Sequence, residues 1–496
     1  MFKPNTLYYA DGYKVGHKRM LAPGTTKLYG TWIPRSVKHA GKGITKIVSF
    51  GQQLTMKWLH DEYTEHFFKL PLEEAMKFQK DMSMYLMQEY DAAHFESLHK
   101  LGYLPIRVKS LPEGVETLPN VPHMTFINTV DGFAWLTLYL ETIISSLAWV
   151  PSTSATTALQ YRRNATEWVM KTDPSNAWLI DYMCHDFSAR GMSPFDMVSS
   201  GLGHATSHKG SDTLVVIPAA RYFYNEPEDK VCINSVNASE HSVSTTKIFT
   251  VGEKQMIIDW LKEFPTGLLS IVADTFDLWK LITEYLKDPE VKGLIMAREG
   301  KLVIRPDSGD PVNIITGLVF ENGKVDVHVN EAATDAEICG VIELLWNIFG
   351  GTINEQGFKV LDSHIGGIYG DSINLIRQVE IYHRLADKGF AATNIVLGVG
   401  SYTYRYVTRD TLGFAAKGAW FECDGKGYDI YKDPITDDGT KKSLKGLIQV
   451  TENFEVKTQC SFEEESKGIL QVIYENGKFL NQTSLEEVRE RIKKLN

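Results

Sequence analysis

The segment from Ile304 to Pro311 combines charged side chains with a glycine and two prolines, directly after an apolar run. Residues 302–304 predict a buried strand, which must end where Arg305 and Asp307 follow. A guanidinium group can bind a phosphate or a carboxylate through parallel hydrogen bonds, and aspartates can hold a sugar diol or hydrated Mg²⁺. A turn whose charges cap the next element is the simpler interpretation of this motif alone. Its meaning therefore depends on whether the pattern recurs.

Three other apolar runs end in the same way. Residues 268–273, 365–369 and 394–397 are followed by Asp274, by Gly370 with Asp371, and by Gly400 with Ser401. Helix-like segments follow most of these runs, and Ser372 is the expected N-cap of the one that reaches Ala386. In a parallel α/β barrel the carboxyl ends of the strands build the active site. We therefore predict an irregular parallel α/β barrel, with a doubly wound open sheet as the alternative.

The two ends of the chain have a different character from this central part. Residues 1–175 mix short strand-like runs with helical stretches at 72–100, 135–149 and 156–171. The tail returns to short strands and charged turns, and it closes with a polar helix at 484–494. We predict an N-terminal α+β domain at 1–175, a barrel at 176–411, and a segment at 412–496 that packs with the N-terminal part into a second, β-containing domain.

Composition narrows the class of protein. The net charge of −10 argues against nucleic acid or an anionic membrane as the main partner. The five cysteines lie far apart without metal-site spacing, which indicates free thiols in a reducing compartment. The start of the chain has no apolar core of signal-peptide length, and the apolar stretch 133–150 contains Glu141. We expect a cytoplasmic protein without a membrane span.

Several motifs occur in one order along the chain. They are Asp11–His17, His185–Gly191, Ser239–Ser242, Ile304–Pro311, Tyr369–Asp371, Gly398–Gly400 and Thr408–Asp410. Over nearly the whole chain this set resembles the nicotinamide phosphoribosyltransferase family. The resemblance implies the barrel-like type II phosphoribosyltransferase fold and a homodimer with active sites at the subunit interface. It also implies the transfer of phosphoribose from 5-phosphoribosyl 1-pyrophosphate to nicotinamide in NAD salvage, with Mg²⁺ as cofactor and ATP as co-substrate.

The resemblance assigns residues to the pyridine ring. It implies that Phe187 and Tyr13, the latter from the partner subunit, stack on the two faces of the ring, and that Ser235 contacts the substrate. Asp212 matches the aspartate that accepts a hydrogen bond from the carboxamide and repels nicotinate. Without the surrounding motifs, Phe187 is more simply a core aromatic residue, Tyr13 a packed loop residue and Asp212 a turn residue.

Other residues are implied for the phosphates. Arg190 can bind the 5′-phosphate through its guanidinium fork, and the backbone of Gly400 and Ser401 can support the same group. Basic residues that the family directs at pyrophosphate or ATP match Arg35, Arg409, Lys417 and Lys432. Each of these four is equally compatible with a solvated surface charge.

The remaining implied residues serve the ribose, the pyrophosphate and catalysis. Asp274, Asp307, Gly370 and Asp371 follow strands, and Arg305 lies beside Asp307. The resemblance directs them at the ribose hydroxyls, the substrate amide and the Mg²⁺-pyrophosphate, while helix capping is the plain alternative for each aspartate. The sequence leaves the metal ligands undetermined, and we expect the substrate pyrophosphate to hold most of the Mg²⁺ coordination.

His241 is implied as the residue that ATP phosphorylates, and with Asp274 and Asp307 it completes the predicted catalytic set. An imidazole nitrogen accepts a phosphoryl group when a carboxylate fixes its tautomer. Either Glu240, its neighbour in sequence, or Asp274 could provide that carboxylate.

The sequence also departs from the family at three places. Tyr402 stands where a small residue is usual, Asn237-Ala238-Ser239 precedes Glu240, and Ser188-Ala189 precedes Arg190. The main alternative function is a nicotinate- or quinolinate-using relative, against which Asp212 argues. A non-catalytic binding dimer and an unrelated phosphate-binding barrel enzyme are further alternatives, but the charged residues are retained and no strand end offers a Schiff-base lysine.

Overall fold

The computed structural model describes residues 3–318, 320–321, 324–325, 333–370, 372–432 and 444–496. The chain divides into two compact units. The first consists of Met1–Thr156, Pro218–Lys230 and Val407–Leu495, and the second of Thr157–Ile217, Val231–Tyr406 and Asn496. Both ends of the chain therefore contribute to the first unit, while the second is built mainly from the middle of the sequence.

The first unit contains a seven-stranded antiparallel sheet with the order β18-β17-β1-β5-β3-β21-β22. Its strands are β1 (Thr25–Ile33), β3 (Ile106–Ser110), β5 (Met124–Asn128), β17 (Ala415–Cys423), β18 (Lys426–Asp429), β21 (Gln471–Glu475) and β22 (Lys478–Phe479). Strand β1 pairs with β17 on one side and with β5 on the other. Three N-terminal strands thus form the middle of this sheet, and C-terminal strands flank them on both sides, which confirms the predicted second, β-containing domain.

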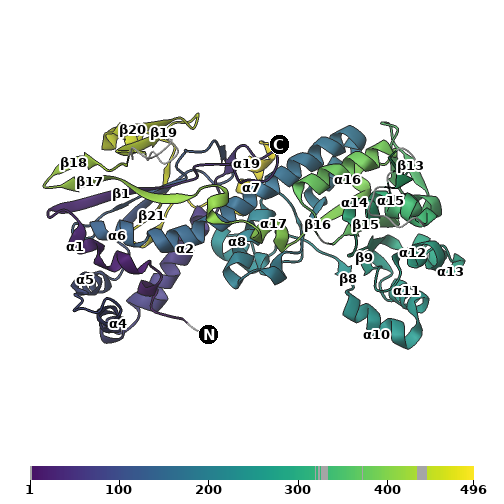
Figure 1. Ribbon diagram of the computed structural model, residues 1–496, viewed down its shortest axis with the longest axis horizontal. Coiled ribbons are helices and arrows are strands. Elements are labelled where there is room, and N and C mark those ends of the chain that lie inside the picture. Colours follow the sequence, from purple (N-terminus) through teal and green to yellow (C-terminus); the bar gives the residue numbers. More distant parts are fainter. Residues whose placement is uncertain (1–2, 319, 322–323, 326–332, 371, 433–443) are drawn as a thin grey trace. The chain divides into compact units, whose positions relative to one another are not determined.

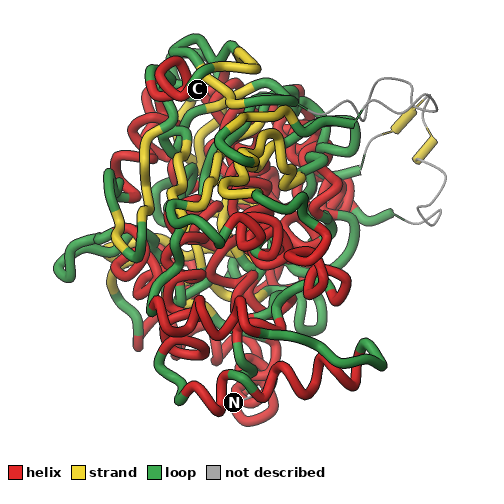
Figure 2. Tube along the Cα trace, turned by 90° about the vertical axis from the view of Figure 1, so that its left-hand side faces the viewer, coloured by secondary structure: helices red, strands yellow, loops and turns green. Residues whose placement is uncertain are grey.

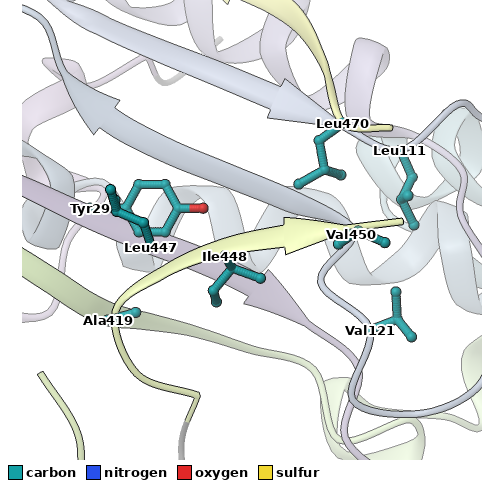
Figure 3. Close-up of a cluster of buried hydrophobic side chains, with 8 residues drawn as sticks. All are labelled: Tyr29, Leu111, Val121, Ala419, Leu447, Ile448, Val450 and Leu470. Atoms are coloured by element: carbon teal, nitrogen blue, oxygen red, sulfur yellow. The ribbon is translucent and has the colours of Figure 1, made fainter. Parts of the chain in front are cut away.

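An apolar cluster holds the two ends of the chain together in this unit. Ile448 and Val450 on β19 (Leu447–Val450) pack with Tyr29 of β1 and Ala419 of β17, as Figure 3 shows. Strand β19 pairs with β20 (Val456–Cys460) in a separate ribbon. The cluster buries apolar surface from segments more than 400 residues apart in sequence, and this burial stabilises the unit.

Several helices of this unit gather on the side that carries the N-terminus (Figures 1 and 2), whereas α19 (Leu485–Lys493) lies near the C-terminus (Figure 1). Helix α6 contacts β1, β5 and β17 of the sheet. The helices are α1 (His17–Met20), α2 (Gln52–Tyr63), α3 (Leu72–Ala75), α4 (Lys77–Tyr85), α5 (Ala93–Leu101), α6 (Ala134–Tyr139), α18 (Phe462–Ser466) and α19 (Leu485–Lys493). A small ribbon of β2 (Ile47–Val48) and β4 (Glu116–Thr117) completes the unit.

The second unit contains a seven-stranded sheet in which every neighbouring pair is parallel, with the order β7-β6-β16-β15-β10-β9-β8. Its strands are β6 (Cys184–Asp186), β7 (Gly210–Ser211), β8 (Asn237–Ala238), β9 (Thr266–Val272), β10 (Glu299–Arg305), β15 (Ile365–Tyr369) and β16 (Ile395–Val399). The apolar runs that predicted strands at 268–273, 302–304, 365–369 and 394–397 correspond to β9, β10, β15 and β16. Strands β6, β7 and β8 have only two or three residues each and were not predicted.

A short segment bridges the two edges of this parallel sheet. Asn234 forms a parallel bridge with Gly210 of β7, and three residues later Asn237 pairs with Leu269 of β9. The sheet therefore curves into an incomplete barrel rather than remaining open. This arrangement confirms the predicted irregular parallel barrel over the doubly wound alternative.

Helices flank the strands of the second unit (Figure 1). They are α8 (Pro194–Ala205), α10 (His241–Val251), α11 (Glu253–Glu263), α12 (Leu278–Lys280), α13 (Pro289–Met296), α14 (Pro311–Thr316), α15 (Asp335–Phe349), α16 (Leu375–Asp387) and α17 (Ser401–Arg405). Short ribbons of β11 (Phe320–Glu321) with β12 (Lys324–Val325), and of β13 (Gly351–Ile353) with β14 (Lys359–Leu361), lie outside the barrel sheet.

Two expectations about helices require correction. Ser372 is not the N-cap of α16, because the side chain of Asn374 accepts hydrogen bonds from the backbone N–H groups of Ile376 and Arg377. The helical stretches expected at 135–149 and 156–171 are instead α6 and a continuous helix α7 (Glu141–Thr172) that includes Pro151.

Two of the boundaries between the units fall inside helices, one in α7 and one in α9 (Val216–Tyr224). Within the described ranges, none of the helices combines the length and the apolar character that crossing a bilayer needs.

Candidate active site

The carboxyl ends of the parallel strands meet at one edge of the barrel sheet, because parallel strands share a direction. Most of the predicted site residues follow these ends. They are Phe187 and Arg190 after β6, Asp212 after β7, His241 after β8, Asp274 after β9, Arg305 and Asp307 at the end of β10, Gly370 after β15, and Gly400 with Ser401 after β16, while Ser235 lies in the bridging segment. The topology thus gathers them from a wide span of the sequence. Asp371 lies outside the described residues.

The position of Phe187 depends on a glycine in the neighbouring strand. The backbone N–H of Phe187 donates to the carbonyl oxygen of Val399 at 2.9 Å, which extends the pairing of β6 with β16. A Cβ atom on Gly398 would lie 2.8 Å from two carbons of the Phe187 ring and 2.7 Å from the carbonyl oxygen of Tyr369. Glycine at 398 therefore makes the space in which the ring lies.

Buried Asp186 ties the loop after β6 to the loop after β7. Its carboxylate accepts hydrogen bonds from the backbone N–H of Ser188 at 2.9 Å and from Oγ1 of Thr213 at 2.7 Å, with Oγ of Ser211 at 3.4 Å. Asp186 is fully buried, so these bonds are strong and costly to lose. No local sequence pattern marked Asp186 as a support of the site.

Asp212 is held by two donors that act on the same oxygen. Oδ1 of Asp212 lies 3.0 Å from Nε2 of His185 and also accepts a hydrogen bond from Oγ of Ser235. Burial raises the pKa of the Asp212 carboxyl, but the hydrogen bonds from His185 and Ser235 and the charge of Arg305 outweigh burial. The pKa is therefore below its ordinary value. The Asp212 side chain is 42% exposed, so its negative charge is accessible from solvent.

The loops that follow β6 and β16 are in close contact. A Cβ atom on Gly191 would clash with the side chain of Ser401, so a glycine is required where the two loops meet. Gly400 is the N-cap residue of the short helix α17. Arg190 is exposed beside these residues and makes no ion pair within the described part of the chain. A cation and backbone N–H groups therefore lie on neighbouring loops.

His241 lies close to two carboxylates at the other end of the site. Its Nε2 is 3.7 Å from Oδ1 of Asp274 and 3.8 Å from Oδ2 of Asp307, and its Nδ1 is 3.3 Å from Oγ1 of Thr275. The His241 side chain is 45% exposed, whereas that of Asp274 is 6% exposed. Of the two carboxylates left open by the sequence, the geometry selects Asp274, while Glu240 is an exposed N-cap residue without a side-chain cap hydrogen bond.

Asp274 is itself held in place on one side only. Its Oδ2 accepts hydrogen bonds from the backbone N–H of Asp307 at 3.0 Å and from Oγ of Ser308 at 2.5 Å. Its Oδ1, which faces His241, is buried and has no hydrogen-bond partner in the described part of the chain. The orientation of this carboxylate is therefore determined by the turn after β10, with one oxygen left available to the site.

The turn from Arg305 to Pro311 is anchored from the neighbouring strand. The Tyr369 hydroxyl lies 2.9 Å from the carbonyl oxygens of both Ser308 and Gly309. Asp310 caps α14 by accepting a hydrogen bond from the backbone N–H of Asn313, which is a structural role. The motif thus contains both site residues and a helix cap.

The other predicted residues belong to the first unit. Tyr13 lies in the short 3₁₀ helix η2 (Gly12–Gly16) and is 66% exposed. Lys417 on β17 lies 3.8 Å from a carboxylate oxygen of Glu141, which also pairs with Lys14 at 2.8 Å. Tyr13, Lys14, Glu141 and Lys417 therefore form one local group, since the charge of Glu141 also acts on the Tyr13 hydroxyl.

Three basic residues of the first unit lie elsewhere along its backbone. Arg35 donates from Nε to the carbonyl oxygen of Gly413 at 3.0 Å, so part of its guanidinium group is used within the unit. Arg409, in the 3₁₀ helix η8 (Arg409–Thr411), lies 3.3 Å from Asp410. Lys432 is exposed. The described residues contain no group of three or more His, Cys, Asp or Glu side chains arranged to hold a metal ion.

The sequence and the fold both match known proteins. A model of the nicotinate phosphoribosyltransferase (NAPRTase) family matches residues 182–475. Nicotinamide phosphoribosyltransferase from Acinetobacter baylyi is 38% identical over 99% of this chain and 97% of its own length. The proteins of that name from Xanthomonas campestris and Mycoplasma pneumoniae are 29% identical over 98% and 33% identical over 72% of this chain, with 97% and 75% of their own lengths covered.

Two solved structures share the fold at low sequence identity. Nicotinate-nucleotide pyrophosphorylase from Pyrococcus furiosus has a TM-score of 0.54 over 99% of this chain and 95% of its own, at 14% identity. Human nicotinic acid phosphoribosyltransferase has a TM-score of 0.55 over 98% of this chain and 92% of its own, also at 14% identity. These similarities confirm the predicted architecture, while the choice of substrate depends on the site residues.

Proposed function

Because the chain belongs to the nicotinate phosphoribosyltransferase family, we propose that it joins nicotinamide to 5-phosphoribosyl 1-pyrophosphate. The products are nicotinamide mononucleotide and pyrophosphate, in NAD salvage. Similarity over nearly the full length to the Acinetobacter baylyi nicotinamide phosphoribosyltransferase supports this activity. The observation that carries the choice of base is the carboxylate of Asp212, whose pKa is lowered and whose hydrogen-bond partner His185 also contacts the ring of Phe187.

Asp212 distinguishes an amide from an acid by charge. Its carboxylate can only accept hydrogen bonds, so it pairs with the NH₂ group of nicotinamide and repels the carboxylate of nicotinate. Its pKa is held below the ordinary value of 3.8. Since a carboxyl with a depressed pKa stays ionised at every pH above that value, the exclusion of nicotinate is expected to be constant from about pH 5 to pH 8.

The remaining residues around the edge suit the transfer of a ribosyl group. Displacement of pyrophosphate from C1 of the ribose passes through a state with oxocarbenium character, so the nucleophile must be aligned and the leaving group neutralised. Nicotinamide attacks through a neutral ring nitrogen and needs no general base. Phe187 would stack on the ring, and Arg190 with the backbone of Gly400 and Ser401 would hold the 5′-phosphate.

Mg²⁺ fits this site through oxygen ligands of the chain and of the substrate. The ion usually keeps several waters and binds one or two carboxylates together with substrate phosphates. The unpartnered Oδ1 of Asp274 and the carboxylate of Asp307 offer such oxygens. When bound, Mg²⁺ would supply positive charge that stabilises the departing pyrophosphate. Gly370, Asp371 and Ser235 are proposed as further substrate contacts.

The family resemblance also supplies the proposals for the first unit. Tyr13 is proposed to stack on the pyridine ring in a homodimer, and Arg409 to bind the substrate pyrophosphate. Arg35, Lys417 and Lys432 are proposed to bind the phosphates of pyrophosphate or ATP. The Tyr13 side chain is 66% exposed, which suits a contact outside its own unit.

Coupling to ATP is proposed to run through His241. The attack of an imidazole nitrogen on the γ-phosphate releases ADP and creates positive charge on the ring, until the proton on the other nitrogen passes to a nearby carboxylate or to solvent. Two carboxylates within 4 Å of Nε2 would stabilise that charge and favour the tautomer with a free lone pair on the other nitrogen. The exposure of His241 leaves room for ATP to approach.

The test of the activity is a direct comparison of two bases. The purified protein is supplied with 5-phosphoribosyl 1-pyrophosphate, Mg²⁺, ATP and either nicotinamide or nicotinate, and the mononucleotide is measured by chromatography. We expect rapid product formation from nicotinamide and little from nicotinate. Product from nicotinate alone would instead assign the alternative nicotinate phosphoribosyltransferase activity.

Asp212→Asn is the matched variant for this comparison, because it keeps the size of the side chain and removes its charge. We expect it to lose most of the discrimination between the two bases. Unchanged selectivity in this variant would contradict the assigned role of Asp212.

A further inference from the structure

We propose that His185 is a positioning residue for base selection, which acts by fixing the orientation of the Asp212 carboxylate through a hydrogen bond from its Nε2. The inference rests on the proposed function and adds a residue to it. The position of His185 at the start of the motif His185–Gly191 does not by itself indicate a role in the reaction. The proposal comes from the contacts of its imidazole ring.

The geometry determines which atom carries the proton. Nε2 of His185 lies 3.0 Å from Oδ1 of Asp212, which is the distance of a direct hydrogen bond. An ionised carboxylate accepts hydrogen bonds and cannot donate them, so the shared proton must be on Nε2. His185 is therefore a donor in this pair in both its neutral form and its charged form.

The two oxygens of Asp212 consequently have different environments. Oδ1 is used by His185 and by Ser235, whereas Oδ2 makes no hydrogen bond in the described part of the chain. Two donors on one oxygen prevent rotation of the carboxylate group about its terminal torsion. Oδ2 is thus held as a single acceptor, already oriented for the amide NH₂ of a base before the base arrives.

His185 is also in contact with the residue proposed to stack on the base. Its ring centroid lies 4.6 Å from that of Phe187, with an angle of 35° between the planes. A Cβ atom on Gly210 would lie 2.9 Å from Nδ1 of His185, so the absence of a side chain at 210 permits this ring position. The His185 side chain is only 12% exposed. One largely buried imidazole thus contacts both the proposed stacking residue and the proposed acceptor of the amide.

The alternative is that His185 only fills space between β6 and β7. The two possibilities differ in what a change of side-chain length should do. Glutamine places an amide nitrogen at the position equivalent to Nε2, while asparagine places it at the position equivalent to Nδ1 and does not reach Asp212. Both variants are polar amides and leave a similar environment, so the pair isolates the hydrogen bond from packing and charge.

The experiment compares His185→Gln and His185→Asn with the wild-type protein in steady-state assays with nicotinamide and with nicotinate. For His185→Asn we expect about a tenfold rise in KM for nicotinamide, since a hydrogen bond to a charged group is lost. We expect kcat within about a factor of two, because the bond serves binding rather than the ribosyl transfer. For His185→Gln we expect KM and selectivity close to those of the wild type.

A second comparison tests whether His185 acts through Asp212. In the presence of Asp212→Asn, the change His185→Asn should cause little further loss of selectivity, because residues that act as one unit are non-additive. Equal KM values for His185→Gln and His185→Asn, or additive effects in the double variant, would overturn the inference. Melting temperatures of the four proteins establish that each variant is folded.

The assay also separates this inference from the proposed function. A wild-type protein that uses only nicotinate refutes the proposed function itself. A wild-type protein that selects nicotinamide, with His185→Asn as selective as the wild type, leaves the proposed function intact and refutes the role of His185.

Discussion

The change Asp274→Asn tests the proposed phosphorylation of His241 most directly. Asparagine can keep an oxygen at the position of Oδ2, where Asp274 accepts hydrogen bonds from the backbone of Asp307 and from Ser308. Its amide nitrogen then takes the position of Oδ1, which has no partner to lose in the described part of the chain. The substitution therefore removes the negative charge beside His241 with little change in the surrounding turn.

The expected magnitude follows from the distance between the two groups. Unit charges 3.7 Å apart interact with about 1 kcal/mol in water and about 4 to 5 kcal/mol at an effective dielectric constant of about 20. The His241 ring is 45% exposed, so solvent screening places the value toward the lower end. A loss of about 1 to 2 kcal/mol corresponds to phosphorylation that is slower by a factor of about 5 to 30.

The assay measures acid-labile phosphate on the protein after incubation with labelled ATP, as a function of time. His241→Ala defines the background, and label that remains in this variant would place the phosphorylation on another residue. Glu240→Gln is the matched control, because it removes a carboxylate that is adjacent in sequence but exposed and without a side-chain cap hydrogen bond. We expect wild-type rates for Glu240→Gln.

The opposite pattern would refute the reasoning. If Glu240→Gln slowed the labelling and Asp274→Asn did not, the carboxylate that matters would be the neighbour in sequence rather than the neighbour in space. Slower labelling in both variants would show that the general negative charge of the region acts, without a specific role for Asp274.

Three further substitutions test how the site is supported. Gly398→Ala places a Cβ atom 2.8 Å from the Phe187 ring, so we expect the KM for nicotinamide to rise about tenfold or more. An unchanged KM would contradict the stacking role of Phe187. Tyr369→Phe removes the hydroxyl that contacts two carbonyl oxygens at 2.9 Å. We expect steady-state kinetics to show a higher KM for 5-phosphoribosyl 1-pyrophosphate, and denaturant titration to show a loss of about 1 kcal/mol in the free energy of unfolding. Thr213→Val leaves buried Asp186 without the hydroxyl that donates to it at 2.7 Å. We expect the free energy of unfolding to fall by about 1 to 3 kcal/mol, with a lower melting temperature. Wild-type stability would show that Asp186 does not need this partner.

Features that depend on residues adjacent in the sequence were predictable. The runs at 268–273, 302–304, 365–369 and 394–397 are long enough and apolar enough to identify β9, β10, β15 and β16. The polar residues that follow them lie at the carboxyl ends of those strands, as the barrel hypothesis required. Asp310 caps α14, in agreement with the simpler interpretation that charges of this motif cap the next element.

Other local signals misled or were too short to interpret. Strands of two or three residues, such as β7 and β8, show no periodicity, so their existence depends on pairing with β6 and β9. Ser372 and Asn374 both suit an N-cap position, and the backbone geometry selects Asn374. Helix α7 continues through Pro151, although proline usually ends a helix at the preceding residue.

The sequence by itself determined which chemical groups are available and the order in which they occur, because motifs and strand ends are properties of adjacent residues. Only the tertiary structure decided which of these groups meet. It placed Asp274 rather than Glu240 beside His241, and it placed His185 and Ser235 on the same oxygen of Asp212. Such contacts depend on the pairing of strands that are far apart in sequence, and no local pattern records that pairing.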